Sequence, residues 1–96
     1  MLYRTKVLYD TAVISYTIII SRGSKGNAMV QKGDIVTVYN RDHATCEVYT
    51  DYAIVVDIIG KNNMGILLGI CYALEVQFIK DPSNTYFRTY YTGGIL

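Results

Sequence analysis

The segment from Met64 to Ile79, with the sequence MGILLGICYALEVQFI, decides the fold class because it fits either a strand or a helix. Every even position from Met64 to Phe78 is apolar, whereas the odd positions include two glycines, a glutamate and a glutamine. This alternation is typical of a strand. A helix would hold Gly65 and Gly69 in its interior at a cost of about 1 kcal/mol each relative to alanine. We therefore predict one long bent strand or two consecutive strands, with these glycines at a bulge or a barrel corner. One helix within residues 64–79 is the alternative.

The rest of the chain is also typical of β-structure. It contains ten tyrosines, nine threonines, two glutamates and no tryptophan, and tyrosine and threonine suit a pleated, half-buried surface. Turn signals at Gly60–Asn63 and Lys80–Asn84 separate the runs. The sequence GDIVTV at residues 33–38 is similar to the turn that leads into a strand in small SH3-like and OB-like barrels, which favours a barrel and assigns no function. Besides 64–79, the predicted strands are residues 2–9, 12–20, 34–40, 44–50, 52–59 and 85–92.

These runs predict an all-β, mainly antiparallel fold, a small barrel or sandwich of six to eight short strands. The alternative is an α+β fold with the helix in 64–79. We expect residues 1–96 to form a single domain with a mobile loop at 21–33, where three glycines interrupt the pattern.

Composition also limits the partners that we expect. The hydrophobic fraction is 51%, the mean hydropathy is +0.20 and the net charge is +1. A small domain with this apolar content is expected to cover part of its surface with a partner, often a second copy of itself. The low charge argues against a nucleic-acid-binding domain dominated by a basic field. We therefore expect a homo-oligomer, with a protein partner as a further possibility. Chains of this size are typical of accessory proteins of viruses or mobile elements.

The sequence carries no targeting signal that we can identify. Its most apolar run, residues 64–73, has half of the roughly 20 residues that a membrane-spanning helix needs. The two cysteines have no recognisable spacing, which favours reduced thiols in an intracellular protein. We expect a cytoplasmic protein with no membrane contact.

The catalytic inventory is thin. The single histidine, His43, lies three residues before Cys46 in a polar segment. The pair suggests a nucleophile or a metal ligand, but in a hairpin the two side chains would point to opposite faces. The favoured explanation is a polar hairpin turn whose next strand begins with a buried cysteine. Asp57 lies in an otherwise apolar run, where we expect it to point outward or to form an ion pair. We predict no enzyme, no catalytic residues, no metal site and no cofactor.

Two segments are candidates for binding. In the sequence SRGSKG at residues 21–26, Arg22 and Lys25 could hold an anion together with glycine amides. The densest aromatic patch is Tyr86 to Tyr91, in which Arg88 lies between aromatic residues. The predicted binding residues are Arg22, Lys25, Tyr86, Arg88, Tyr90 and Tyr91.

Tyrosine and arginine are enriched at protein interfaces, and aromatic rings also stack on the bases of single strands. The sequence therefore predicts a non-catalytic binding or assembly module that self-associates and contacts a protein partner through a tyrosine-rich face. A nucleic-acid or nucleotide binder that uses the 21–26 loop and the aromatic patch around Arg88 is the alternative.

Overall fold

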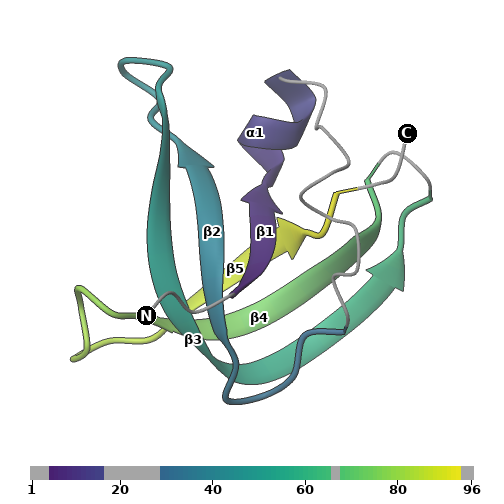
Figure 1. Cartoon of the computed structure of the whole chain (residues 1–96), viewed down its shortest axis with the longest axis vertical. Coiled ribbons are helices and arrows are strands. Elements are labelled where there is room, and N and C mark those ends of the chain that lie inside the picture. The colour runs from purple at the N-terminus through teal and green to yellow at the C-terminus, as the bar shows by residue number, and fades with distance from the viewer. Residues whose placement is uncertain (1–4, 17–28, 66–67, 94–96) are drawn as a thin grey trace.

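The computed structural model describes residues 5–16, 29–65 and 68–93, which form a closed β-barrel with one short helix (Figure 1). The order around the barrel is β1-β2-β3-β4-β5. This confirms the predicted all-β class, with five strands in the described part of the chain instead of six to eight. The elements are β1 (Lys6–Asp10), α1 (Thr11–Tyr16), β2 (Ile35–Arg41), β3 (Val48–Asn63), β4 (Ile70–Phe78) and β5 (Tyr86–Tyr91).

Most of the barrel is an antiparallel meander, in which β2 to β5 pair in sequence order. The first strand closes it, because β1 pairs parallel with β2 and antiparallel with β5. A parallel pair needs a crossover connection of a dozen residues or more. The chain between Asp10 and Ile35, which includes α1, provides that connection.

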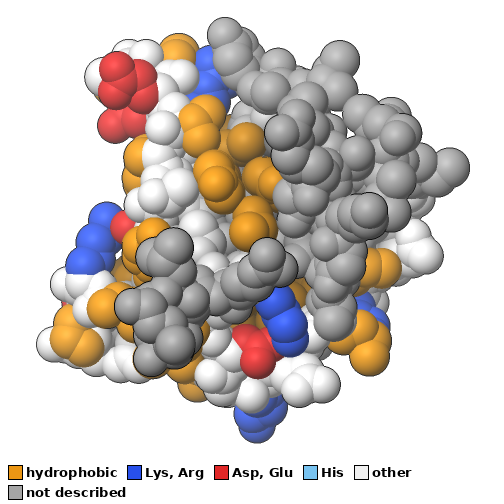
Figure 2. Space-filling view, viewed as in Figure 1, with side chains coloured by type: hydrophobic (Ala, Val, Ile, Leu, Met, Phe, Trp, Pro, Cys, Tyr) orange, Lys and Arg blue, Asp and Glu red, His pale blue; other side chains and the backbone are white. Residues whose placement is uncertain are grey.

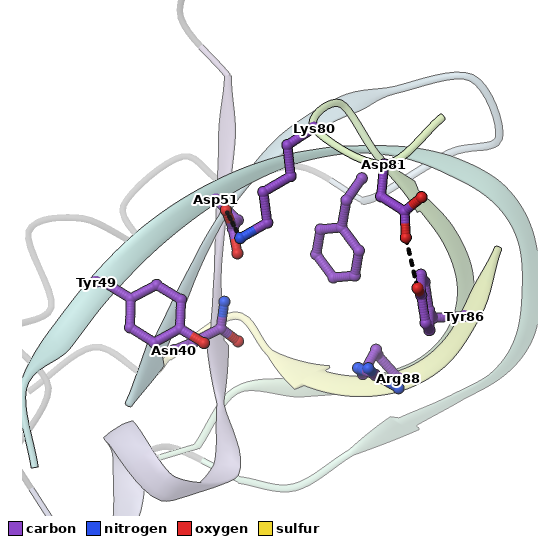
Figure 3. Close-up of a pocket in the computed structure, with 8 residues that line it drawn as sticks. Asn40, Tyr49, Asp51, Lys80, Asp81, Tyr86 and Arg88 are labelled. Carbon is purple, nitrogen blue, oxygen red and sulfur yellow. Dashed lines mark hydrogen bonds and ion pairs between the residues drawn. The ribbon is translucent and has the colours of Figure 1, made fainter. Parts of the chain in front are cut away.

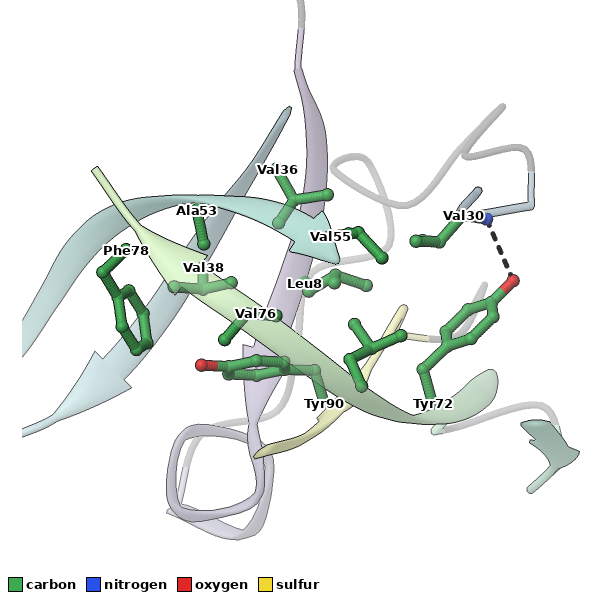
Figure 4. Packing of buried hydrophobic residues seen from close by; sticks show 11 residues of the cluster. Leu8, Val30, Val36, Val38, Ala53, Val55, Tyr72, Val76, Phe78 and Tyr90 are labelled. Atoms are coloured by element: carbon green, nitrogen blue, oxygen red, sulfur yellow. Dashed lines mark hydrogen bonds between the residues drawn. The ribbon is translucent and has the colours of Figure 1, made fainter. Parts of the chain in front are cut away.

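The core fills the inside of the barrel, and its residues follow the period of two that the sequence shows. On β4 the alternate residues from Tyr72 to Phe78 are buried, and those between them are partly exposed. The other strands supply matching alternate positions, so the side chains meet inside the barrel (Figure 4). The cluster consists of Leu8, Val30, Val36, Val38, Ala53, Val55, Tyr72, Leu74, Val76, Phe78 and Tyr90.

A second, smaller cluster covers part of the outside of the barrel. Tyr9 on β1 and Val13 on α1 are buried together, with Val7 and Tyr39 packed against them. The rings of Tyr9 and Tyr39 stack with centroids 5.3 Å apart. Hydrophobic side chains gather over β1 and β2 on the face shown in Figure 2. The helix therefore shields the outer side of the parallel pair.

The prediction of a strand at 12–20 was wrong for the part that the structure describes, because Thr11–Tyr16 forms α1. Residues 17–20 lie outside the described residues. The Asp10 carboxylate accepts a hydrogen bond from the Ala12 N–H at 3.1 Å, as an N-terminal helix cap does. Packing of Val13 on Tyr9 then holds the helix in place, so this cap and this contact override the β-propensity of the local residues.

The second correction concerns the connection between β3 and β4. The predicted turn at Gly60–Asn63 lies inside β3, and the two strands predicted at 44–50 and 52–59 are replaced by one strand, Val48–Asn63. The chain reverses between Asn63 and Ile70, which pair with each other, and Gly65 and Gly69 in this connection have φ of +95° and +75°. The register shifts that indicate bulges fall in β3, between Val55 and Gly60.

The choice between strand and helix at 64–79 is settled for most of that segment. Ile70–Phe78 forms β4, so the strand prediction is confirmed there and the helix alternative is wrong. The predicted hairpin between β2 and the following strand and the turn at residues 80–84 are also present. Of the loop predicted at 21–33, residues 21–28 lie outside the described part. No helix among the described residues is long and apolar enough to cross a membrane.

Candidate functional site

A pocket of about 260 Å³ opens at one end of the barrel (Figure 3). The end of β2, the start of β3, the end of β4, the β4–β5 turn and the start of β5 surround it. Its walls combine four charged side chains with three aromatic rings and one amide. The lining residues are Asn40, Tyr49, Asp51, Phe78, Lys80, Asp81, Tyr86 and Arg88.

The pocket continues the inside of the barrel, because its residues follow the same alternation as the core. On β5, Tyr86, Arg88 and Tyr90 share one face of the strand, and Tyr90 is buried in the core. On β3, Asp51 precedes the buried Ala53 on the same face. The inward-facing positions are therefore apolar in the middle of the barrel and polar at this end.

Three of the four charged side chains in the pocket have partners among their neighbours. Lys80 Nζ lies 3.1 Å from the Asp51 carboxylate. The Tyr86 hydroxyl donates a hydrogen bond of 2.5 Å to the Asp81 carboxylate, which also accepts one from the side-chain amide of Asn84 at 3.2 Å. The hydrogen bond to Asp81 raises the pKa of Tyr86 above its ordinary 10.0, and burial adds to this. The two carboxylates therefore have partners already.

Arg88 has a different environment. Its guanidinium lies over the Tyr86 ring, 5.0 Å from the ring centroid, which is a cation–π geometry. It donates one hydrogen bond, of 3.1 Å, to the backbone carbonyl of Phe87. Among the residues that the structure describes, no carboxylate forms an ion pair with it. The pocket therefore contains one positive charge that no described carboxylate neutralises.

Tyr90 lies beneath the pocket. Its side chain is 0% exposed, and its hydroxyl has no hydrogen-bond partner among the described residues. Burial raises the pKa of Tyr90 far above its ordinary value, and the charge of Arg88 opposes this effect. Asp51 and Tyr49 act on the same hydroxyl, and Figure 4 shows it pointing toward the end of the barrel where Phe78 lies. It is a buried donor that points toward the end of the barrel at which the pocket opens.

The structure brings together only some of the predicted binding residues. Tyr86 and Arg88 line the pocket and Tyr90 lies below it, so Tyr90 is not part of the exposed surface. Tyr91 is half-buried on the opposite face of β5, where it pairs with Tyr9 and Cys71 at the closure of the barrel. Arg22 and Lys25 lie outside the described residues.

Several pocket residues were not predicted from the sequence, because they come from different strands. Asn40, Asp51 and Lys80 are neither adjacent in the sequence nor part of a motif. The available signal was their spacing, since Asn40 lies two residues after the buried Val38 and Asp51 two residues before the buried Ala53. A polar residue that continues an inward-facing series is a candidate for the end of a barrel.

The segment around His43 and Cys46 is an exposed turn between β2 and β3. The Asp42 carboxylate accepts hydrogen bonds from the N–H groups of Ala44 and Thr45 at 2.7 and 3.0 Å, and these bonds lower its pKa. Cys46 has φ of +64° and is exposed, so the expectation of a buried cysteine was wrong. No group of three or more His, Cys, Asp or Glu in the described ranges could hold a metal ion.

Asp57 combines the two arrangements expected for it. Its carboxylate is about half exposed and lies 3.8 Å from Lys32 Nζ. It also accepts a hydrogen bond from the Ile58 N–H at 2.9 Å. An exposed ion pair of this length contributes little to stability, and its position on β3 is separate from the pocket lining.

Comparison with known proteins adds no further assignment. No protein-family model matches this chain, no curated protein matches it, and no solved structure matches it. The fold and the pocket define a small five-stranded barrel with a polar pocket at one end. A function must therefore be argued from the geometry of that end.

Proposed function

We propose that this protein is a non-catalytic binding module that self-associates and contacts a protein partner through the end of the barrel around the pocket. One observation carries the proposal: exposed apolar side chains gather on the outside of the barrel at the same end as the charged pocket. Among the described residues, nine large hydrophobic side chains are exposed, and five of them line the pocket or directly neighbour a lining residue in the sequence. These five are Val48, Tyr49, Tyr52, Ile79 and Phe87.

This composition resembles that of protein interfaces. Phe87 is 68% exposed and Tyr49 is 44% exposed, and large aromatic side chains in such positions contribute strongly to binding when a partner covers them. Arg88, which follows Phe87 in the sequence and lines the pocket, is also of a residue type enriched at interfaces. A second copy of the chain is one partner that this end of the barrel can accept.

The arrangement of the rings favours a protein partner over a single-stranded nucleic acid. Stacking on bases needs an open ring face. In the predicted aromatic patch, Arg88 covers one face of the Tyr86 ring and Tyr90 is buried, which leaves Phe87 as the exposed ring of that patch. The carboxylate of Asp81, whose hydrogen bonds come from the neutral Tyr86 hydroxyl and Asn84 amide, would also repel phosphates.

Sedimentation equilibrium of the full chain tests the proposal. We expect concentration-dependent association that Phe87→Ser and Arg88→Glu both weaken. Ile59→Ser is the matched control, because Ile59 is apolar and 58% exposed but does not neighbour a pocket residue. A chain that stays monomeric up to about 1 mM, where binding is worth only about 4 kcal/mol, would contradict self-association.

Fluorescence polarisation with labelled single strands tests the alternative. A nucleic-acid binder loses affinity as salt rises, because phosphate contacts release counterions. Salt-sensitive binding that Arg88→Glu abolishes would replace the protein partner by nucleic acid. We expect no such binding at this end of the barrel.

A further inference from the structure

The charges in the pocket leave Arg88 available for a ligand. Lys80 and Asp51 form an ion pair, and Asp81 accepts hydrogen bonds from Tyr86 and Asn84. Arg88 has no carboxylate partner among the described residues. Its stacking on Tyr86 restricts the planar guanidinium, so less conformational freedom is lost when it binds a second group. A ligand that completes this arrangement carries a negative charge.

The hydroxyl of Tyr90 adds a second, independent observation. It is fully buried and has no partner in the part of the chain that the structure describes, and it points toward the end of the barrel where Phe78, one of the lining residues, lies. A buried hydroxyl without a partner costs free energy that a bound acceptor would recover. The raised pKa keeps the phenol protonated, so it acts as a donor. Tyr90 and Arg88 lie two residues apart on the same face of β5, and the charge of Arg88 acts on the hydroxyl.

The size and the walls of the pocket limit the anion. Its volume of about 260 Å³ lies below the roughly 300–1,000 Å³ of pockets that enclose drug-sized ligands. Asp81 in the walls disfavours a doubly charged phosphate. A carboxylate is small, carries a single charge and matches the planar fork of arginine with two parallel hydrogen bonds.

We propose that the pocket binds a carboxylate group of the protein partner, either an Asp or Glu side chain or a C-terminal carboxylate, with Arg88 as its ion pair and the Tyr90 hydroxyl as a buried hydrogen-bond donor. This inference rests on the proposed function and names the chemistry of the contact. The partner then inserts its carboxylate into the pocket while its surrounding surface covers the exposed apolar side chains.

NMR titration of the full ¹⁵N-labelled chain tests the proposal with small probes. N-acetylglycine represents a C-terminal carboxylate, and the α-amide of N-acetylaspartate represents an acidic side chain. N-acetylglycine amide is the neutral control, and inorganic phosphate is the competing anion. We expect both carboxylates to shift the Arg88 and Asp51 signals with saturation, and the stronger of the two identifies the source of the group.

Variants separate the two contacts. Arg88→Ala should weaken binding about tenfold or more, because hydrogen bonds to charged groups contribute most. Tyr90→Phe should weaken it about threefold to tenfold, since it removes only the hydroxyl. Lys32→Ala removes an exposed charge that is not in the pocket lining and should leave binding unchanged.

The following results would overturn the proposal. Equal shifts with the neutral amide would exclude recognition of charge, and tighter binding of phosphate would exclude a carboxylate site. Unchanged carboxylate affinity in Arg88→Ala would show that Arg88 does not pair with the ligand. Unchanged affinity in Tyr90→Phe would show that the Tyr90 hydroxyl does not donate to it. If a chain that sediments as a monomer still binds carboxylates saturably, the carboxylate site is supported and self-association is contradicted. The two proposals therefore fail separately.

Discussion

The turn between β3 and β4 makes a sharp prediction, that Gly69→Ala destabilises the barrel severely. Gly69 has φ of +75°, and an added Cβ would lie 2.5 Å from the backbone oxygen of Gly93 and closer still to the Thr92 hydroxyl. The turn is anchored to the end of β5 at this point. Thr92 exchanges hydrogen bonds of 2.9 Å with Ile70, and the Gly93 N–H donates to the Leu68 carbonyl at 3.0 Å.

The magnitude has two parts. The left-handed backbone costs a residue with a Cβ about 1–2 kcal/mol. Moving the chain after β5 away from the new methyl group disrupts two or three hydrogen bonds worth about 1 kcal/mol each. The sum is about 3–5 kcal/mol, a large fraction of the roughly 5–15 kcal/mol by which a domain is stable.

Urea unfolding followed by far-ultraviolet circular dichroism measures this loss. Gly65→Ala is the matched control, because Gly65 has φ of +95° but nothing lies within 4 Å of an added Cβ. It should show the backbone cost of about 1–2 kcal/mol alone. At Gly60 the Cβ would meet only the Ala73 Cβ at 3.8 Å and φ is not positive, so Gly60→Ala should be neutral or stabilising. A Gly69→Ala variant no less stable than Gly65→Ala would refute the close approach.

Three further predictions concern single side chains. Cys46→Gly should stabilise the protein by about 0.5–1 kcal/mol in thermal melting, because Cys46 has φ of +64°; a loss of stability would show that the thiol makes a favourable contact. Burial raises the pKa of Asp34, but the hydrogen bonds from Lys6 and Gln31 and the Lys6 charge outweigh it, so the pKa lies below its ordinary 3.8. The stabilisation from ionised Asp34 is therefore full above the unfolded pKa and is lost as pH falls through the folded pKa. In urea unfolding, Asp34→Asn should cost stability at about pH 6 and little at about pH 2. Equal losses at both pH values would contradict this linkage. Tyr90→Phe should raise the free energy of unfolding by about 1 kcal/mol, since it removes a buried hydroxyl without a described partner; a less stable variant would show that the hydroxyl is hydrogen-bonded in the folded protein.

The sequence predicted the all-β class, and left barrel and sandwich open, because one signal was strong. Alternate residues from Tyr72 to Phe78 are apolar in the sequence and buried in the structure. That pattern depends only on the period of a strand, which tertiary contacts do not change. The same reasoning failed at residues 12–16, where an aspartate cap and one buried contact produce a helix from residues that favour strands.

The failure at Gly60–Asn63 has a different cause. Glycine and asparagine favour turns locally, but here pairing with β4 decides the conformation, because Lys61, Asn62 and Asn63 lie opposite Tyr72, Cys71 and Ile70. Two register shifts in β3 absorb the extra residues. Local propensity cannot reveal such pairing, since it depends on where the partner strand begins.

The pocket was only partly predictable for the same reason. Tyr86 and Arg88 are conspicuous because they lie in a dense aromatic patch, so composition alone identified them. Asn40, Asp51 and Lys80 join them only through the closure of the barrel and the turn after β4. The burial of Tyr90 was missed because a tyrosine in such a patch suggests a surface, whereas the alternation on β5 directs it inward.

The two measurements on Tyr90→Phe together decide what the buried hydroxyl contributes. Phenylalanine fills the same space without a polar atom, so packing alone gives no reason for a hydroxyl at this position. A variant that gains stability and loses affinity for carboxylates would show that the hydroxyl costs folding free energy and contributes to binding, a relation expected at functional sites. A variant that gains stability and keeps its affinity would leave recognition to Arg88 alone. The barrel end would then bind its partner through a surface arginine and the surrounding apolar side chains, without a contribution from the core.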